Sequence, residues 1–233
     1  MNGCHQNLYE SQVISCNYGP ETGKALVVLV GGSHSLQWLP ALKILADKYN
    51  FRLASLTKSG CVLSSSDPGL NQTVRNIESC MEWNERALSE IASLSPDLIV
   101  TIGTRHVNGE ELIPDGYWNT WQKLEMLGFP LLALRDNPWF EFDMPYCVEK
   151  NKNLKNCSIK KTDFYAEENP LLEVDLTNLH TADLVELYCF NDTCPGVIDD
   201  VLVYRDKHHL TKTFVVKNYS VLERVIQQTG LIF

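Results

Sequence analysis

Two hydrophobic periodicities alternate along the chain. Short continuous apolar runs, which are typical of strands buried on both faces of a sheet, occur at residues 25–30, 52–56, 98–102, 130–134 and 201–204. Between them, apolar residues recur at the spacing of an amphipathic helix, at residues 36–49, 71–91, 117–127 and 212–228. This alternation predicts a parallel sheet that is covered by helices on both faces. We therefore expect an α/β fold: a three-layer α/β/α sandwich with a mostly parallel, five-stranded sheet.

The periodicity also divides the chain into segments. The 233 residues suit a single α/β core, which we place at residues 25–233. Residues 1–24 are polar, contain two cysteines and are expected to form a leader that packs on this domain. Residues 136–195 lose the regular alternation, so we expect an elaborated insertion there, with a helical part at residues 177–186. Gly230 follows the last predicted helix and is a typical helix-ending residue.

Composition and charge exclude some classes of protein. The formal net charge is -9 at pH 7 and no cluster of Lys and Arg occurs, so a nucleic-acid partner is not expected. No stretch approaches the roughly 20 apolar residues needed to span a bilayer. The first residues lack the apolar core of a signal peptide, so export would depend on a signal or membrane segment outside this sequence.

The cysteines indicate the compartment. An even number of cysteines at short separations is typical of disulfide bonds formed outside the reducing cytoplasm. Eight cysteines allow about a hundred pairings, so their connectivity stays open at this point. Zinc is the weaker alternative, because no CxxC motif occurs and the six histidines are not at zinc-finger spacings; no metal and no cofactor are expected. The eight cysteines are Cys4, Cys16, Cys61, Cys80, Cys147, Cys157, Cys189 and Cys194.

Two segments far apart in the sequence carry the residues of serine acyl chemistry. Ser33 follows the first buried run directly after Gly31 and Gly32, where a strand ends and a helical segment begins. Open α/β sheets bind ligands at that edge, and a helix N-terminus favours a developing oxyanion. Asp206 and His209 follow the last apolar run three residues apart, so one turn can place a base beside the group that orients it. Taken singly, these residues could equally be a helix cap, a turn aspartate and a surface histidine.

The motifs around these residues resemble the SGNH (GDSL-like) hydrolase superfamily. In that superfamily a GDS block near the N-terminus carries the nucleophile, and a DxxH block near the C-terminus carries the other two triad members. Here the blocks read GGSH at residues 31–34 and DKHH at residues 206–209. More narrowly, GSHSLQWLPAL, LTKSGC at residues 56–61, RDNPW at residues 135–139 and YRDKHHLT resemble the SGNH domain fused behind multi-pass membrane acyltransferases of bacterial envelopes. The resemblance implies an SGNH hydrolase (flavodoxin-like) fold.

The resemblance assigns roles to single residues. It implies that Ser33 is the nucleophile and that His209 is its base, oriented by Asp206. The pattern DxxHL favours His209 over its neighbour His208, which we expect to be a surface residue. His34 follows the nucleophile directly and points away from it if the turn continues into a helix; we expect it to contact the reacting residues from behind and to take no direct part in the reaction.

The sequence departs from the superfamily pattern at two positions, and one of these departures concerns the oxyanion hole. The resemblance implies a hole made by the backbone amides of Ser33 and Gly60, since glycine lets the backbone approach a substrate closely. Gly32 replaces the usual Asp of the GDS block, which removes no triad member. The Asn of the GxND block is missing, and Arg105 stands in its place. Three roles are open for Arg105: a substitute donor to the oxyanion, a clamp for an anionic acceptor, or an exposed surface residue.

The resemblance also supports a pairing of each cysteine with its neighbour in the sequence. A bridge between Cys61 and Cys80 would tie the loop that contains Gly60 to the helix that follows it. A disulfide that closes a loop of this size stabilises a domain by about 3 kcal/mol. The expected pairs are Cys4 with Cys16, Cys61 with Cys80, Cys147 with Cys157, and Cys189 with Cys194.

Aromatic residues near these motifs have two interpretations. Trp38 and Trp139, together with Phe140, could form a platform for a sugar ring or an acyl chain. The other interpretation is burial in the core, which is the commoner role of large aromatic side chains.

The combined expectation is an extracytoplasmic O-acyltransferase, and more specifically an O-acetyltransferase, that acts on a cell-envelope glycan or glycolipid. Ser33 would take an acyl group from a donor delivered by a membrane acyltransferase domain and pass it to a sugar hydroxyl that His209 deprotonates. One alternative is an extracellular carbohydrate esterase, in which water takes the acyl group. The other is a degenerate module that binds glycan without turnover, which is suggested by Gly32 and the missing Asn.

Overall fold

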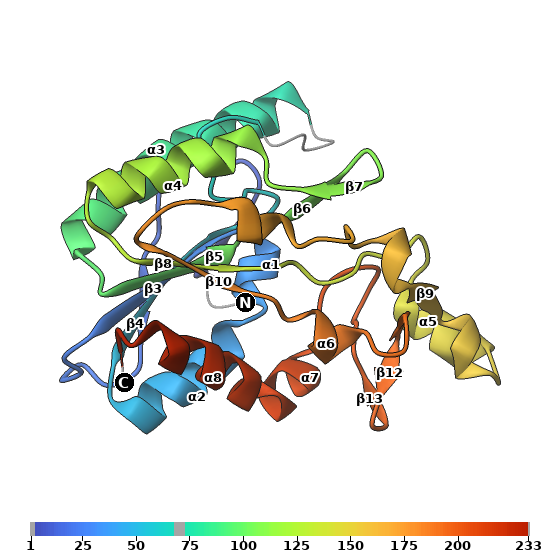
Figure 1. Ribbon diagram of the computed structural model, residues 1–233. Coiled ribbons are helices and arrows are strands. Elements are labelled where there is room, and N and C mark those ends of the chain that lie inside the picture. The colour runs from blue at the N-terminus through green and yellow to red at the C-terminus, as the bar shows by residue number, and fades with distance from the viewer. Residues whose placement is uncertain (1–2, 68–72, 233) are drawn as a thin grey trace.

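The computed structural model describes residues 3–67 and 73–232. Within these residues, a seven-stranded sheet lies at the centre in the order β1-β4-β3-β5-β8-β10, and β2 also pairs with β4 (Figure 1). The pairing of β2 with β4 is antiparallel and the other pairings of this sheet are parallel. The strands are β1 (His5–Gln6), β2 (Cys16–Tyr18), β3 (Leu26–Gly31), β4 (Arg52–Lys58), β5 (Leu98–Ile102), β8 (Leu131–Leu134) and β10 (Leu179–Ala182).

Helices cover both faces of the sheet, so the three-layer α/β/α sandwich is confirmed (Figure 1). Val27 and Leu29 of β3 face one apolar cluster, while Val28 and Val30 face the other. Because both faces are covered, every residue of β3 is buried, which explains its continuous apolar sequence. The first face is covered by α2 (Leu39–Tyr49), α7 (Lys212–Lys217) and α8 (Tyr219–Thr229), and the second by α3 (Val74–Leu94) and α4 (Asp115–Met126).

The fifth predicted strand is wrong. Val201–Leu202 forms β13, which pairs with β12 (Val197–Ile198) as a small antiparallel ribbon outside the main sheet. Its place in the sheet is taken by β10, which pairs with β8 and lies where a helical segment, residues 177–186, was predicted. Helix in that region is confined to α6 (Val185–Tyr188). Val203 and Tyr204 are nevertheless fully buried, so the apolar run at residues 201–204 marks core packing and not a sheet strand.

The predicted helices differ from the observed ones mainly at their ends. The segment at residues 36–49 is divided into α1 (Ser33–Leu36) and α2, and the last helix is divided into α7 and α8 at Asn218. The predicted start of the long helix at Asn71 lies outside the described residues. Gly230 ends α8 in the left-handed conformation, with φ +67, as its position predicts. Across residues 3–67 and 73–232, no helix combines the length and the apolar character needed to cross a membrane.

The N-terminal segment is built into the edge of the sheet. Both β1 and β2 lie within residues 1–24 and pair with β4. Lys58, whose side chain is buried at the end of β4, donates to the carbonyl oxygens of Asn7 at 2.9 Å and Glu10 at 2.8 Å. Gln6 accepts a hydrogen bond from the indole of Trp83 on α3 at 2.8 Å. The leader is therefore held to the domain by strand pairing and by buried polar contacts.

All four disulfides join the expected cysteine pairs, and no cysteine is free.

The remaining elements lie mostly in the segment 136–195, beside the carboxyl end of the sheet (Figure 1). The elements not yet named are the ribbon of β6 (Arg105–Val107) with β7 (Glu110–Leu112), the ribbon of β9 (Ser158–Lys160) with β11 (Thr193–Pro195), the helix α5 (Met144–Lys150), and 3-10 turns at Leu154–Asn156, Lys161–Asp163 and Pro170–Glu173.

Candidate active site

Ser33 stands on a sharp turn at the carboxyl end of β3. Gly31 has φ +124, a conformation that L side chains rarely adopt, and a side chain there would also collide with α1. Gly32 is the N-cap of α1, and a Cβ at this position would lie 3.2 Å from the carbonyl oxygen of Cys61. The absence of a side chain at Gly32 thus lets the loop that contains Gly60 pack directly against the residue before Ser33.

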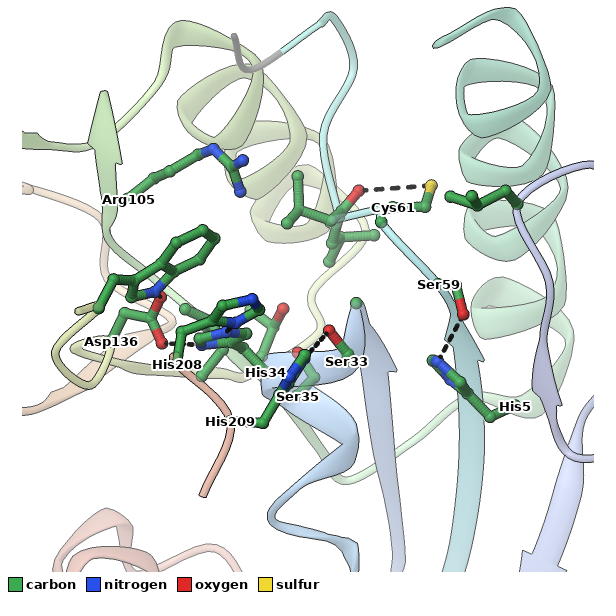
Figure 2. A pocket seen from close by; sticks show the side chains of 18 of the residues that line it. His5, Ser33, His34, Ser35, Ser59, Cys61, Arg105, Asp136, His208 and His209 are labelled. Carbon is green, nitrogen blue, oxygen red and sulfur yellow. Dashed lines mark hydrogen bonds and ion pairs between the residues drawn. The ribbon is translucent and has the colours of Figure 1, made fainter. Parts of the chain in front are cut away.

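A chain of hydrogen bonds joins Ser33, His209 and Asp206, and Figure 2 shows its first link, between Ser33 and His209. The distance from Ser33 Oγ to His209 Nε2 is 2.7 Å, and the distance from His209 Nδ1 to Asp206 Oδ2 is also 2.7 Å. The other oxygen of Asp206 accepts the backbone amides of His208 at 2.9 Å and His209 at 2.8 Å. This geometry allows His209 to take a proton from Ser33 while Asp206 holds the ring in the required tautomer.

The environment tunes both titrating groups of this chain. Burial alone would raise the pKa of Asp206, but the two backbone amides and the ring of His209 outweigh it and lower that pKa to about 2. Burial lowers the pKa of His209 below 6.5, and the neighbouring His34 adds to this effect, while the hydrogen bond to Asp206 opposes it. At neutral pH, Asp206 is therefore ionised and His209 is an unprotonated base.

Two further histidines belong to the site, and one of them, His208, was expected at the surface. His34 was expected to point away from the nucleophile, but α1 has four residues and its first turn faces the cavity, as Figure 2 shows. Its Nδ1 lies 2.7 Å from Asp136 Oδ1 and its Nε2 lies 2.8 Å from His208 Nδ1. His208 was expected to be a surface residue, yet it is half-buried and lines the same cavity. These orientations depend on contacts with Asp136, which is far away in the sequence.

The aromatic residues divide between the core and the site. Trp38 is 1% exposed and packs in the core, so for this residue the buried interpretation holds and the substrate platform does not. Phe140 is also buried, at 4% exposed. Trp139 lines the cavity and stacks on His208, with ring centroids 4.3 Å apart and an angle of 17° between the planes. Trp139 therefore supports a histidine of the site, and its role toward a substrate stays a prediction.

A cavity of about 640 Å³ opens beside Ser33. Gly60 lines it with φ +55, which brings the loop after β4 to the mouth of the site. Leader residues form another wall, and among them His5 bonds to Ser59 at 3.0 Å. The sequence did not predict this wall, because polar residues outside a motif do not indicate where they lie in the fold. The lining residues include 5–8, 32–35, 59–63, 101, 102, 104, 105, 117, 136, 139, 205, 208 and 209.

Arg105 lies in the cavity wall at the start of β6. Figure 2 shows its guanidinium apart from Ser33, on a different side of the cavity. It lies over the ring of Trp139 at 5.7 Å, and its buried Nε has no hydrogen-bond partner among the described residues. This position suits a contact with a bound molecule better than a contact with an oxyanion at Ser33.

Within residues 3–67 and 73–232, three histidines of the site form a group that could hold a metal ion. One nitrogen from each of His34, His208 and His209 lies within 4.8 Å of the others. Tetrahedral zinc with bonds of about 2.0–2.1 Å would hold two nitrogens roughly 3.3 Å apart. The nitrogens of His34 and His208 are 2.8 Å apart, which is the length of a hydrogen bond, and His209 Nε2 is bonded to Ser33. The cluster as built is a hydrogen-bonded network and does not fit a metal.

The fold and the grouping of Ser33, His209 and Asp206 define an α/β domain of the SGNH type. A family model described as "SGNH domain (fused to AT3 domains)" matches residues 3–216, and the chain belongs to this family. The resemblance found in the motifs is thereby confirmed. A comparison with curated proteins finds no match.

Among solved structures, the chain is similar to a lipopolysaccharide acetyltransferase periplasmic domain of Salmonella ser. Paratyphi A. The two are 14% identical, with a TM-score of 0.63, and the match covers 89% of this chain and 85% of that one. A likeness at this level of identity establishes a common fold.

Proposed function

We propose that this domain is an extracytoplasmic O-acetyltransferase that modifies a hydroxyl group of a cell-envelope glycan or glycolipid. The observation that carries the proposal is the hydrogen-bonded chain of Ser33, His209 and Asp206 beside a cavity of about 640 Å³. The family, whose members are fused to AT3 domains, supports a membrane acyltransferase as the partner that delivers the acyl donor. The fold shared with a lipopolysaccharide acetyltransferase periplasmic domain supports acetyl transfer to a glycan-type acceptor.

The first half-reaction acylates Ser33. Its Oγ attacks the carbonyl carbon of the donor, and its proton passes to His209 Nε2. The ionised Asp206 stabilises the resulting imidazolium, which then protonates the leaving group of the donor. The amides of Ser33, at the start of α1, and of Gly60, at the cavity mouth, are the proposed donors to the oxyanion.

The second half-reaction transfers the acyl group. A hydroxyl of the acceptor attacks the ester carbonyl, and its proton passes to His209 Nε2. The bond from the carbonyl carbon to Ser33 Oγ then breaks, and Oγ takes back the proton from His209. Ser33 again carries its hydroxyl proton and His209 is again unprotonated, as at the start, and the acceptor carries the acetyl group.

The four disulfides support a location outside the cytoplasm, where such bonds persist. A tether through a membrane domain would keep the site close to the partner that delivers the acyl donor. In this proposal Arg105 is a clamp for an anionic part of the donor or acceptor.

The decisive experiment uses p-nitrophenyl acetate as donor with purified envelope glycans as acceptors, and mass spectrometry of both protein and products. We expect one acetyl group on the peptide that contains Ser33, followed by acetylated glycan. Ser33→Ala should abolish both, whereas Ser89→Ala, on an exposed position of α3, should behave as the wild type.

Other outcomes separate the alternatives. Free acetate with every glycan tried would make the protein an esterase. Binding of glycan with no acetyl-enzyme would make it a binding module, and full activity of Ser33→Ala would refute the serine mechanism.

A further inference from the structure

A second aspartate–histidine chain runs beside the triad and plays no part in the mechanism above. Asp136, at the carboxyl end of β8, contacts His34 Nδ1 at 2.7 Å, and His34 Nε2 contacts His208 Nδ1 at 2.8 Å. Asp136 and His34 are both buried, at 4% and 8% exposed, while His208 is half-buried at the cavity. Figure 2 shows this chain approaching the cavity next to His209 and Ser33.

The hydrogen bonds along this chain all run in one direction, from His208 through His34 to Asp136. The carboxylate of Asp136 can only accept, and it already accepts from the amide of Asn137 at 2.9 Å and the indole of Trp139 at 3.2 Å. In the neutral form of His34, Nδ1 must therefore donate to this carboxylate, which leaves His34 Nε2 as an acceptor. His208 Nδ1 must then donate to His34, so the free electron pair of His208 is on Nε2.

His208 is held firmly in this orientation. Its ring stacks on Trp139, and its backbone amide donates to Asp206 while its carbonyl oxygen accepts from Asn137 Nδ2 at 2.7 Å. Nε2 has no hydrogen-bond partner among residues 3–67 and 73–232, although the residue lines the cavity. Burial, with the nearby His34 and His209, lowers the pKa of His208 to about 4, which keeps the ring neutral at pH 7. The cavity thus contains a fixed, unused hydrogen-bond acceptor.

This acceptor lies next to the catalytic base. The ring centroids of His208 and His209 are 4.1 Å apart and both residues line the cavity, so the two rings are neighbours in its wall. If one hydroxyl of the acceptor gives its proton to His209 Nε2, a hydroxyl on the adjacent carbon can donate to His208 Nε2.

We propose that His208 is a specificity-determining residue that recognises a vicinal diol, binding the hydroxyl next to the one that is acetylated. His34 and Asp136 are positioning residues, because they fix the tautomer of His208 and do not touch the acceptor. The inference rests on the proposed acetyl transfer and narrows its acceptor to molecules with two adjacent hydroxyl groups, as most sugars have.

The tautomer can be tested without any substrate. Two-bond 1H–15N spectra of histidine-labelled protein at pH 7, assigned by comparison with His208→Gln, should show His208 protonated at Nδ1 and unprotonated at Nε2. In His34→Gln this preference should be lost, because the acceptor for Nδ1–H has changed. A His208 protonated at Nε2 in the wild type would overturn the inference.

The recognition is tested by competition between small acceptors. The wild type, acetylated by p-nitrophenyl acetate, is given cyclohexanol together with cis- or trans-1,2-cyclohexanediol, and the acetylated products are counted by mass spectrometry. We expect one of the diols to be favoured per hydroxyl by roughly fivefold, the size of one net hydrogen bond. The preference should disappear in His208→Phe and persist in part in His208→Gln, whose side-chain oxygen can accept.

Ratios within one variant do not depend on how active that variant is, so a general loss of activity cannot imitate the result. An unchanged diol preference in His208→Phe, or no preference in the wild type, would refute the role of His208 and leave acetyl transfer intact. Formation of free acetate alone, with every alcohol, would instead refute the proposed transferase and this inference with it.

Discussion

Replacing Asp206 with Asn changes one atom of the triad and tests the orientation of His209. Oδ1 of Asp206 accepts the two backbone amides, and the side-chain oxygen of Asn can keep both bonds. Oδ2 accepts from His209 Nδ1, and in Asn this position is an NH2 group that can only donate. His209 would then carry its proton on Nε2, facing Ser33 Oγ, and could not take the proton of Ser33.

The expected loss is large. The same exchange in a serine-protease triad lowers kcat by about 10⁴, which corresponds to about 5 kcal/mol of transition-state stabilisation. The rate constant of the p-nitrophenolate burst, measured with p-nitrophenyl acetate by stopped flow, reports this step directly. The melting temperature should change little, because the two amide hydrogen bonds of Asp206 persist.

A matched variant separates this effect from a general change of charge. Asp199→Asn removes an exposed carboxylate, 3.6 Å from Lys217, and should keep the burst rate of the wild type. A burst rate of Asp206→Asn within tenfold of the wild type would refute the role of Asp206. A large fall in its melting temperature would show that the residue acts through folding.

Three further results are expected. Because His209 must be unprotonated and its pKa is lowered below 6.5, the plot of kcat/KM against pH should fall as pH drops through a value under 6.5; an acid limb above 6.5 would contradict this assignment. Glu111→Gln breaks a fully buried ion pair with Arg135 and should lower the free energy of unfolding by about 3–5 kcal/mol, or the melting temperature by at least about 6 °C. The control Glu110→Gln, at an exposed position, should leave the melting temperature unchanged. Equal melting curves of the two variants would refute the stabilising role of the ion pair. Arg105→Ala should raise the KM for a uronic acid acceptor, while a fall in kcat of roughly 100-fold with KM unchanged would identify an oxyanion donor instead.

The central strands could be predicted because their environment is uniform. β3 and β5 are covered on both faces and read as continuous apolar runs. β10, in contrast, lies at the edge of the sheet, and three of its four residues are only partly buried. Its place depends on pairing with β8, in which Leu179 lies opposite Leu131, and local hydrophobicity does not reveal a contact between residues so far apart in the sequence.

The site shows the same division. Ser33, Asp206 and His209 carry recognisable motifs, and the structure brings them within hydrogen-bond distance of one another. The place of His34 follows from the short length of α1 and from the position of Asp136, neither of which is a local property of the sequence. Trp38 is buried because the chain turns between α1 and α2, which directs its ring into the core.

The connectivity of the disulfides bears on how the protein is made. Each bond joins two cysteines that are consecutive in the chain, with separations of 12, 19, 10 and 5 residues. During the export that the proposed location requires, the cysteines would emerge in pairs, and an oxidant that joins each new thiol to the one before it would make the native set. Rearrangement of wrong disulfides is slow, and this order of emergence avoids it. Formation of the native set in this order therefore needs oxidation of the thiols and little rearrangement of disulfides.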